Sequence, residues 1–183
     1  MVQTNLLSRD SSLIVRKAEL RDGPGISRVC SDGWRDTYAS IHTPEEIERV
    51  IGKYYSLERI SNEIGGPLEY DGADYDWDGW LVAERGDGRV LGASGGGPTG
   101  ERTWEVFVLY LDPNERRRGI GRALLNAMTN QARVRGASEQ WVSVMYGNLR
   151  GIPFYEAMGF VTAHETDTLS GVKSLHMRRS IEP

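Results

Sequence analysis

A long amphipathic helix stands between two apolar strands in residues 103–146, and this order constrains the fold more than any other feature. TWEVFVLYL reads as one strand, and EQWVSVMY is apolar on both faces, which favours a central position in a sheet. Between them, apolar residues recur at i, i+4, i+7 and i+8 and form one face of the helix: Ile120, Leu124, Ala127 and Met128. A strand, a long helix and another buried strand form a crossover, so the chain is predicted to fold as an α/β domain.

Further strands and helices are predicted around this crossover. Residues 12–20 alternate apolar and charged side chains and predict a first strand. Residues 22–41 and 43–64 predict two helices, the second with a proline at its first helical position. GWLVAE, RVLGASGG and TWEVFVLYL predict an antiparallel meander, LRGIPFYEAMGF predicts a short helix, and GVKSLHMRRS predicts a last strand. With one more strand between the short helix and this last strand, the expected order is β-α-α-β-β-β-α-β-α-β-β.

Composition narrows the classes of protein to which the chain can belong. With 183 residues, 39% of them hydrophobic and 26% charged, the sequence fits a single domain over residues 13–183 after a flexible tail at residues 1–12. The single cysteine, Cys30, excludes an internal disulfide framework. The sequence shows neither a membrane-spanning apolar run nor a signal peptide, which favours a cytoplasmic location. The net charge of -4 argues against a general nucleic-acid binder.

The turn NERRRGIGRALL joins the first strand of the crossover to the long helix and carries the clearest binding signal. Glycines at a helix start let a ligand approach the backbone, whose N–H groups and dipole favour an anion such as phosphate. The motif is neither a Walker loop nor the full G-x-G-x-x-G of dinucleotide folds, and a solvated basic turn is the alternative. Its basic and glycine residues are Arg116, Arg117, Arg118, Gly119, Gly121 and Arg122.

Two motifs resemble one family. RRRGIG is similar to the R/Q-x-x-G-x-G/A acyl-CoA signature of the GNAT superfamily of N-acetyltransferases, and NLRGIPFYEAMGF resembles that family's N-x-x-A-x-x-F-Y-E-x-x-G-F segment. The resemblance implies a mixed, mostly antiparallel central sheet, flanked by helices and splayed at the coenzyme site. It also implies acetyl-CoA as donor, with its pyrophosphate on the backbone amides of Arg117 through Arg122. The residues that it assigns to the coenzyme are Val108, Leu109, Leu111, Arg116, Arg117, Arg118, Gly119, Ile120, Gly121, Arg122 and Asn148.

Two positions depart from the family pattern. Gly151 stands where the family usually has alanine. Pro153 would delete a helical hydrogen bond if the short helix began with Asn148 as its N-cap. The helix is therefore expected to begin closer to the proline.

Acetyl transfer to an amine needs a base and an acid, and one residue is a candidate for each. An amine is protonated at neutral pH, so a base must remove its proton. Glu105 stands where some members of the family carry a catalytic glutamate; a solvated glutamate, with another carboxylate or water as base, is the alternative. The resemblance places Tyr155 beside the coenzyme sulfur, where a phenol can protonate the leaving thiolate, and a place in an aromatic core is the alternative. A strand irregularity near Val108 and Leu109 would free a backbone N–H for the oxyanion.

The acceptor site is predicted from aromatic and acidic residues. Trp34 and Tyr38 lie four apart on the first helix, and Trp77 lies within EYDGADYDWDGW. Such a surface would attract a cationic amine by charge and by ring faces, and a solvated loop whose aromatics enter the core is the alternative. The scattered histidines lack ligand spacing, so no metal site is predicted.

These features together predict an N-acetyltransferase that moves an acetyl group from acetyl-CoA directly to a primary amine of a small molecule or peptide. No nucleic-acid or membrane partner is expected, and a homodimer is left open. A non-catalytic acyl-CoA-binding sensor or interaction module is the alternative, and nucleic-acid binding by the arginine cluster is the third hypothesis. Polyamines, antibiotics, amino acids and protein amino groups all stay open as acceptors.

Overall fold

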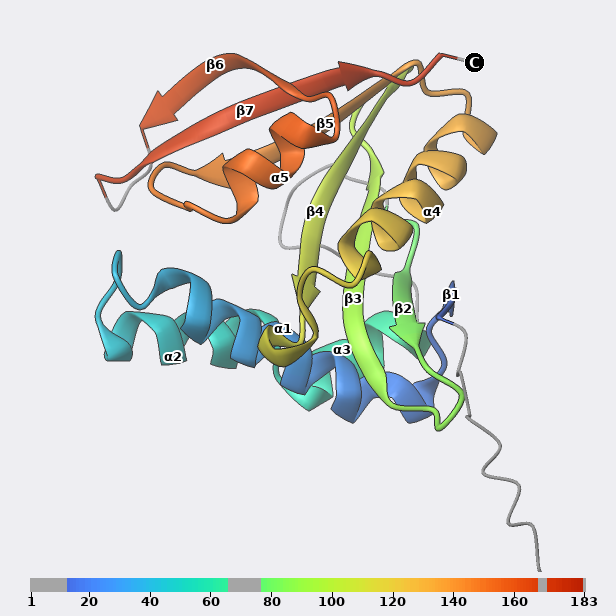
Figure 1. Ribbon diagram of the computed structural model, residues 1–183, viewed down its shortest axis with the longest axis vertical. Helices are drawn as coiled ribbons and strands as arrows, with labels where there is room; N and C mark the ends of the chain where they lie inside the picture. Colours follow the sequence, from blue (N-terminus) through green and yellow to red (C-terminus); the bar gives the residue numbers. More distant parts are fainter. Residues whose placement is uncertain (1–12, 66–76, 168–170, 183) are drawn as a thin grey trace, which may run out of the picture.

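The computed structural model describes residues 13–65, 77–167 and 171–182, which fold around one mixed β-sheet (Figure 1). The tail predicted at residues 1–12 lies outside the described residues. The described strands form a seven-stranded sheet in the order β1-β2-β3-β4-β5-β7-β6. Their bounds are β1 (Ile14–Lys17), β2 (Trp80–Glu84), β3 (Val90–Pro98), β4 (Thr103–Leu111), β5 (Glu139–Met145), β6 (Val161–Asp167) and β7 (Lys173–Ser180).

Neighbouring strands run antiparallel except for β4 and β5, which run parallel. The crossover that joins this parallel pair contains α4 (Ile120–Val134), where the apolar spacing predicts a helix. β2, β3 and β4 form the predicted meander. The mixed, mostly antiparallel sheet expected from the sequence is therefore confirmed.

The two middle strands of the sheet separate toward one end. β4 and β5 pair only over residues 103–106 and 139–142, although the structure describes both strands along their full length. A register shift between β3 and β4 makes Phe107 an extra residue on β4. This bulge lies one position before the irregularity predicted near Val108 and Leu109. The sheet is thus splayed immediately after the bulge.

Helices cover both faces of the sheet (Figure 1). Neighbouring residues of β3 alternate between the two: Leu91 packs in one apolar cluster with Leu124 of α4, and Val90 packs in another with Ile26 of α1. The helices other than α4 are α1 (Gly23–Tyr38), α2 (Pro44–Tyr54), α3 (Leu57–Gly65) and α5 (Gly151–Ala157). α1 and α3 share the second cluster, whereas α4 and α5 contribute to the first.

The single helix predicted over residues 43–64 is in fact two helices, α2 and α3. α2 ends because the backbone of Tyr55 leaves the helical conformation, at φ -126° and ψ 16°. The Ser56 Oγ then accepts a hydrogen bond from the N–H of Arg59 at 3.3 Å and caps the start of α3. The Tyr55 ring packs edge-on against Tyr110, with 5.8 Å between the centroids. This tertiary contact accompanies a break that helical spacing alone does not reveal.

β5 has the predicted central position, but only one of its faces is buried. Val142 and Val144 lie in the core, whereas Ser143 is exposed on the other face. Trp141 and Met145 share that outer face and are half-buried, and their apolar character led to the prediction of a strand buried on both sides. The outer face of β5 is thus free to contribute to a site.

Candidate functional site

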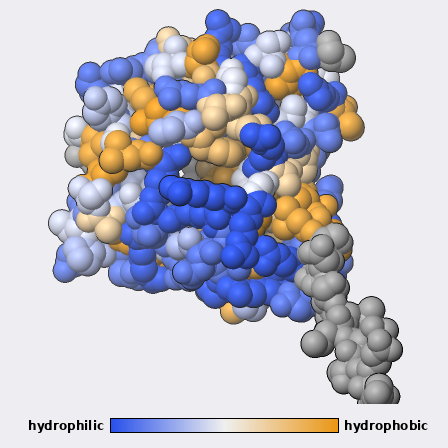
Figure 2. Space-filling view, viewed as in Figure 1, coloured by the Kyte–Doolittle hydropathy of each residue, from blue (hydrophilic) through white to orange (hydrophobic). Residues whose placement is uncertain are grey.

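The separation of β4 from β5 opens a cleft of about 530 Å³. Its walls come from the end of β4, the middle of β5, the start of α4, α5 and one side of α1. On one face of the molecule, hydrophilic side chains border a group of apolar ones near the middle (Figure 2). Of the residues that the sequence assigns to the coenzyme, all except Arg118 line the cleft.

The start of α4 forms one wall of the cleft. Gly119 is the N-cap and has a left-handed backbone (φ 79°), which glycine adopts without strain. Arg117 also has a positive φ, 61°. No side chain caps the helix, so the N–H groups of its first turn have neither a helical nor a side-chain partner in the described structure. This arrangement suits an anion, as the sequence predicts.

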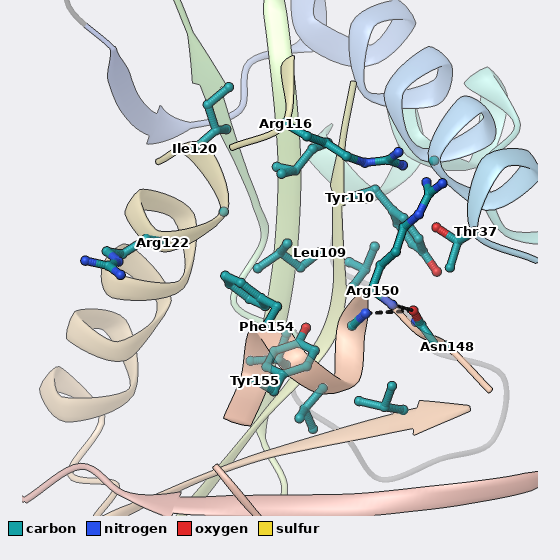
Figure 3. A pocket seen from close by; sticks show the side chains of 18 of the residues that line it. Thr37, Leu109, Tyr110, Arg116, Ile120, Arg122, Asn148, Arg150, Phe154 and Tyr155 are labelled. Carbon is teal, nitrogen blue, oxygen red and sulfur yellow. Dashed lines mark hydrogen bonds between the residues drawn. The ribbon is translucent and has the colours of Figure 1, made fainter. Parts of the chain in front are cut away.

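The arginines of the turn point in different directions. Arg116, together with Arg150 from the loop before α5, forms an ion pair with Asp36 of α1, and both side chains extend toward α1 (Figure 3). Arg118 instead binds Glu115 at 3.0 Å, which explains its absence from the cleft wall. The positive charge at the cleft therefore comes partly from Arg150, which lies outside the arginine-rich turn before α4.

Asn148 is buried and fixes the start of α5. Its Oδ1 accepts hydrogen bonds from the N–H groups of Gly151 at 2.7 Å and Arg150 at 3.2 Å (Figure 3). α5 begins at Gly151, so Pro153 falls in the first turn, as expected from its missing N–H. A Cβ at Gly151 would lie only 2.7 Å from Nδ2 of Asn148, which gives a steric reason for glycine where the family usually has alanine.

Tyr155 combines a core position with access to the cleft. Its ring packs edge-on against Phe154 and Phe160, with centroid separations of 5.1 and 5.3 Å. The residue also lines the cleft, into which its hydroxyl points (Figure 3). Burial raises the pKa of Tyr155, so the phenol keeps its proton at neutral pH.

Glu105 lies beside the cleft rather than in its wall. Its carboxylate Oε1 accepts a hydrogen bond of 3.1 Å from the hydroxyl of Ser143, which does line the cleft. Burial raises the pKa of Glu105, and the bond from Ser143 acts in the opposite direction. A carboxylate with a raised pKa is a better proton acceptor than an ordinary solvated one.

The aromatic residues predicted to bind the acceptor are divided between the cleft and the core. Trp34 and Tyr38 pack together, with 4.1 Å between the ring centroids, but only Tyr38 lines the cleft. Trp77 stacks on Phe107 at 6.3 Å and lies over Gly95 of β3. Most of the segment EYDGADYDWDGW, its residues 69–76, lies outside the described residues.

Several cleft residues could not be identified from the sequence. Ser143 gives a weak signal, as the single hydroxyl in an apolar strand. Thr37 and Arg150 lie in segments that the sequence assigns to the site, but nothing in the sequence singles them out, and Phe154 follows from its place beside Tyr155. Among the described residues, no group of three His, Cys, Asp or Glu side chains could hold a metal ion, and no helix is long and apolar enough to cross a membrane.

Residues 47–160 match the Acetyltransferase (GNAT) family, and the chain belongs to this family. The family resemblance of the two sequence motifs is thus confirmed, and the splayed sheet is the one that it implies.

Known relatives agree with this membership. The chain is 28% identical to a spermidine N(1)-acetyltransferase of Thermoplasma acidophilum over 149 residues, 81% of this chain and 88% of that protein. It is similar to the crystal structure of PaiA N-acetyltransferase from the same organism in complex with coenzyme A, with a TM-score of 0.76 and 27% identity over 92% of this chain and 99% of that one. It is 36% identical to mycothiol acetyltransferase of Beutenbergia cavernae over 81 residues, which are 44% of this chain and only 27% of that protein's length.

Proposed function

We propose that the protein is an N-acetyltransferase that moves the acetyl group of acetyl-CoA directly to a primary amine. The observation that carries the proposal is a single cleft that joins an open helix start to a buried phenol, with a hydrogen-bonded carboxylate at its edge. A cleft of about 530 Å³ lies within the usual range of about 300–1,000 Å³ for small-molecule sites.

The residues around the cleft fit the donor. The N–H groups at the start of α4 would hold the pyrophosphate, with Arg117 and Arg122 adding positive charge at the rim. The apolar side chains of Leu109 and Leu111 would contact the pantetheine arm along β4. When bound, acetyl-CoA supplies an activated thioester.

Each chemical step is assigned to a group of this chain. Glu105 takes the proton of the acceptor amine, with Ser143 bonded to its carboxylate. Backbone N–H groups of β4 beside the bulge at Phe107 stabilise the negative charge that develops on the thioester oxygen. Tyr155 donates its hydroxyl proton to the departing sulfur.

A thiol-release assay over a panel of amines tests the proposal. Spermidine is the first acceptor to try, because a relative similar over most of this chain is named for it. Amino acids, aminoglycosides and peptides with free amino ends complete the panel. We expect thiol release that depends on both acetyl-CoA and an amine.

The same assay separates the alternatives. Acetyl-CoA binding without thiol release over the whole panel would favour a sensor or interaction module. Binding to nucleic acid that weakens steeply with salt would favour the third hypothesis.

A further inference from the structure

A chain of hydrogen bonds runs from Glu105 across four strands. The Ser143 hydroxyl on β5 contacts Oε1 of Glu105 on β4 at 3.1 Å and Nδ1 of His176 on β7 at 3.0 Å. Nε2 of His176 contacts Oγ1 of Thr166 on β6 at 2.9 Å. Ser143 and His176 are directly opposite in the antiparallel register. Each of the four strands thus contributes one polar side chain to a single line.

In this series of hydrogen bonds, every donor points toward the carboxylate of Glu105. An ionised Glu105 only accepts, so the hydroxyl proton of Ser143 is directed at it. The Ser143 oxygen then accepts from His176, which places the imidazole proton on Nδ1. Nε2 of the neutral ring is left as an acceptor for the hydroxyl of Thr166. One tautomer therefore satisfies every bond.

The His176 ring is held by its neighbours as well as by hydrogen bonds. It stacks on His164 of β6, with 4.4 Å between the centroids and 8° between the planes. Other groups on this face are Arg178 of β7 and Glu139 of β5, which pair with each other at 2.8 Å. The titratable or charged side chains that these contacts place beside the hydrogen bonds are Glu105, His164, Arg178 and Glu139, and His42 contacts Met145 on the same face of β5.

On the basis of the proposed function, we propose that Ser143 and His176 are positioning residues for the base Glu105. His176 orients the Ser143 hydroxyl, and Ser143 in turn fixes the carboxylate at the edge of the cleft. Neither side chain takes the amine proton. Their contribution is to keep one carboxylate rotamer and its ionised form available to the acceptor.

The pH dependence of this arrangement has a definite sign. Burial raises the pKa of Glu105, and the bond from Ser143 lowers it again. Removing that bond leaves burial unopposed, so Glu105 would hold its proton up to a higher pH. The rising acidic limb of kcat/KM should then move to higher pH.

Variants of both residues test the inference. Ser143→Ala should move the acidic limb up by about one pH unit, the size expected for one hydrogen bond to a charged group. His176→Phe keeps a flat ring to stack on His164 but loses the donor, so the limb should move in the same direction by less. His176→Asn places an amide N–H near the position of Nδ1 and should restore the wild-type profile. Acetyl-CoA affinity should stay unchanged in the two His176 variants, because His176 does not line the cleft.

Ser174→Ala, two residues from His176 on β7, is the matched control and should leave the profile in place. Glu105→Gln separates this inference from the proposed function. If Glu105→Gln removes the acidic limb while Ser143→Ala and His176→Phe leave it unmoved, the positioning role is wrong and the base stands. If Glu105→Gln keeps the limb, the base is wrong and the positioning role falls with it. NMR titration of the Glu105 carboxyl in the same variants measures the change in its pKa directly and needs no acceptor amine.

Discussion

At the scale of single residues, the position of Tyr155 is compatible with both interpretations that the sequence leaves open, a core aromatic and a proton donor. Its ring packs between Phe154 and Phe160, and its hydroxyl reaches the cleft (Figure 3). Because burial raises the pKa of Tyr155, the phenol keeps its proton at neutral pH, as the proposed acid role requires. The packing and the proposed acid role can therefore be separated by removing the oxygen alone.

Tyr155→Phe should lower turnover by on the order of 10²-fold, because the leaving thiolate loses its proton donor. The ring and its packing are kept, so Tm and acetyl-CoA affinity should stay close to wild type. The measurements are turnover with the best amine of the panel, calorimetric affinity and thermal unfolding. Tyr146→Phe, at an exposed tyrosine just after β5, is the matched control. Turnover of Tyr155→Phe within about threefold of wild type would return this tyrosine to a purely structural role.

At the scale of elements, the start of α4 is shaped by its two glycines for different reasons. Gly119 supplies the left-handed cap at φ 79°, and a Cβ there would meet open space. A Cβ at Gly121 would lie 3.3 Å from Cε2 of Phe154, so this glycine also allows α5 to approach α4. The turn thus serves packing as well as the predicted anion site.

A pair of substitutions at Gly121 tests the anion site. Gly121→Asp puts a carboxylate beside the N–H groups proposed to hold pyrophosphate, so acetyl-CoA affinity should fall by at least about tenfold. Gly121→Asn has nearly the same size without the charge, and it reports how much of the loss comes from crowding Phe154. Calorimetry on both variants and the wild type measures the difference. Equal affinities for the Asp and Asn variants would mean that no phosphate binds there.

At the scale of the whole molecule, one buried carboxylate connects segments from different parts of the chain. Asp112, 2% exposed, follows β4 and binds Arg28 of α1 and Arg89, the residue before β3, each at 2.8 Å. It also accepts a hydrogen bond of 3.0 Å from the N–H of Asn114, in the turn that leads to α4. Burial by itself would raise the pKa of Asp112, but these bonds outweigh it and lower the pKa from 3.8 to about 2.

This carboxylate makes the stability of the fold depend on pH. The pKa of Asp112 is lower in the folded protein than in the unfolded chain. Its contribution to the free energy of unfolding is therefore complete above the unfolded pKa and is lost as the pH falls from about 4 toward 2. Asp112→Asn should lower the free energy of unfolding at pH 7 by about 2 kcal/mol and reduce the slope between pH 4 and 2. Denaturant unfolding at several pH values measures both effects. An unchanged slope in the variant would show that other carboxylates set the acid stability.

Prediction from the sequence was most complete where the evidence is local. The helical spacing from Ile120 to Met128, the turn at Gly119 and the meander of strands each depend on neighbours along the chain, and the structure has them where predicted. The break at Tyr55 was missed because helical spacing alone does not reveal it; the residue that packs against it, Tyr110, is distant in sequence. The roles assigned to Glu105 and Tyr155 stay predictions.

The sequence by itself determined the order of most elements, the glycine turn before α4 and the membership of the family, because apolar periodicity and short motifs are properties of the chain alone. Only the tertiary structure decided which further side chains join the coenzyme motifs at the site. The pairing of β4 with β5 ends beside the bulge at Phe107, and Ser143 lies just beyond the last paired residues and lines the cleft. The register of β5 with β7 then sets Ser143 opposite His176, a residue that reads as isolated in the sequence. Contacts between distant segments depend on strand register and on packing, and neither is encoded in the spacing of any single segment.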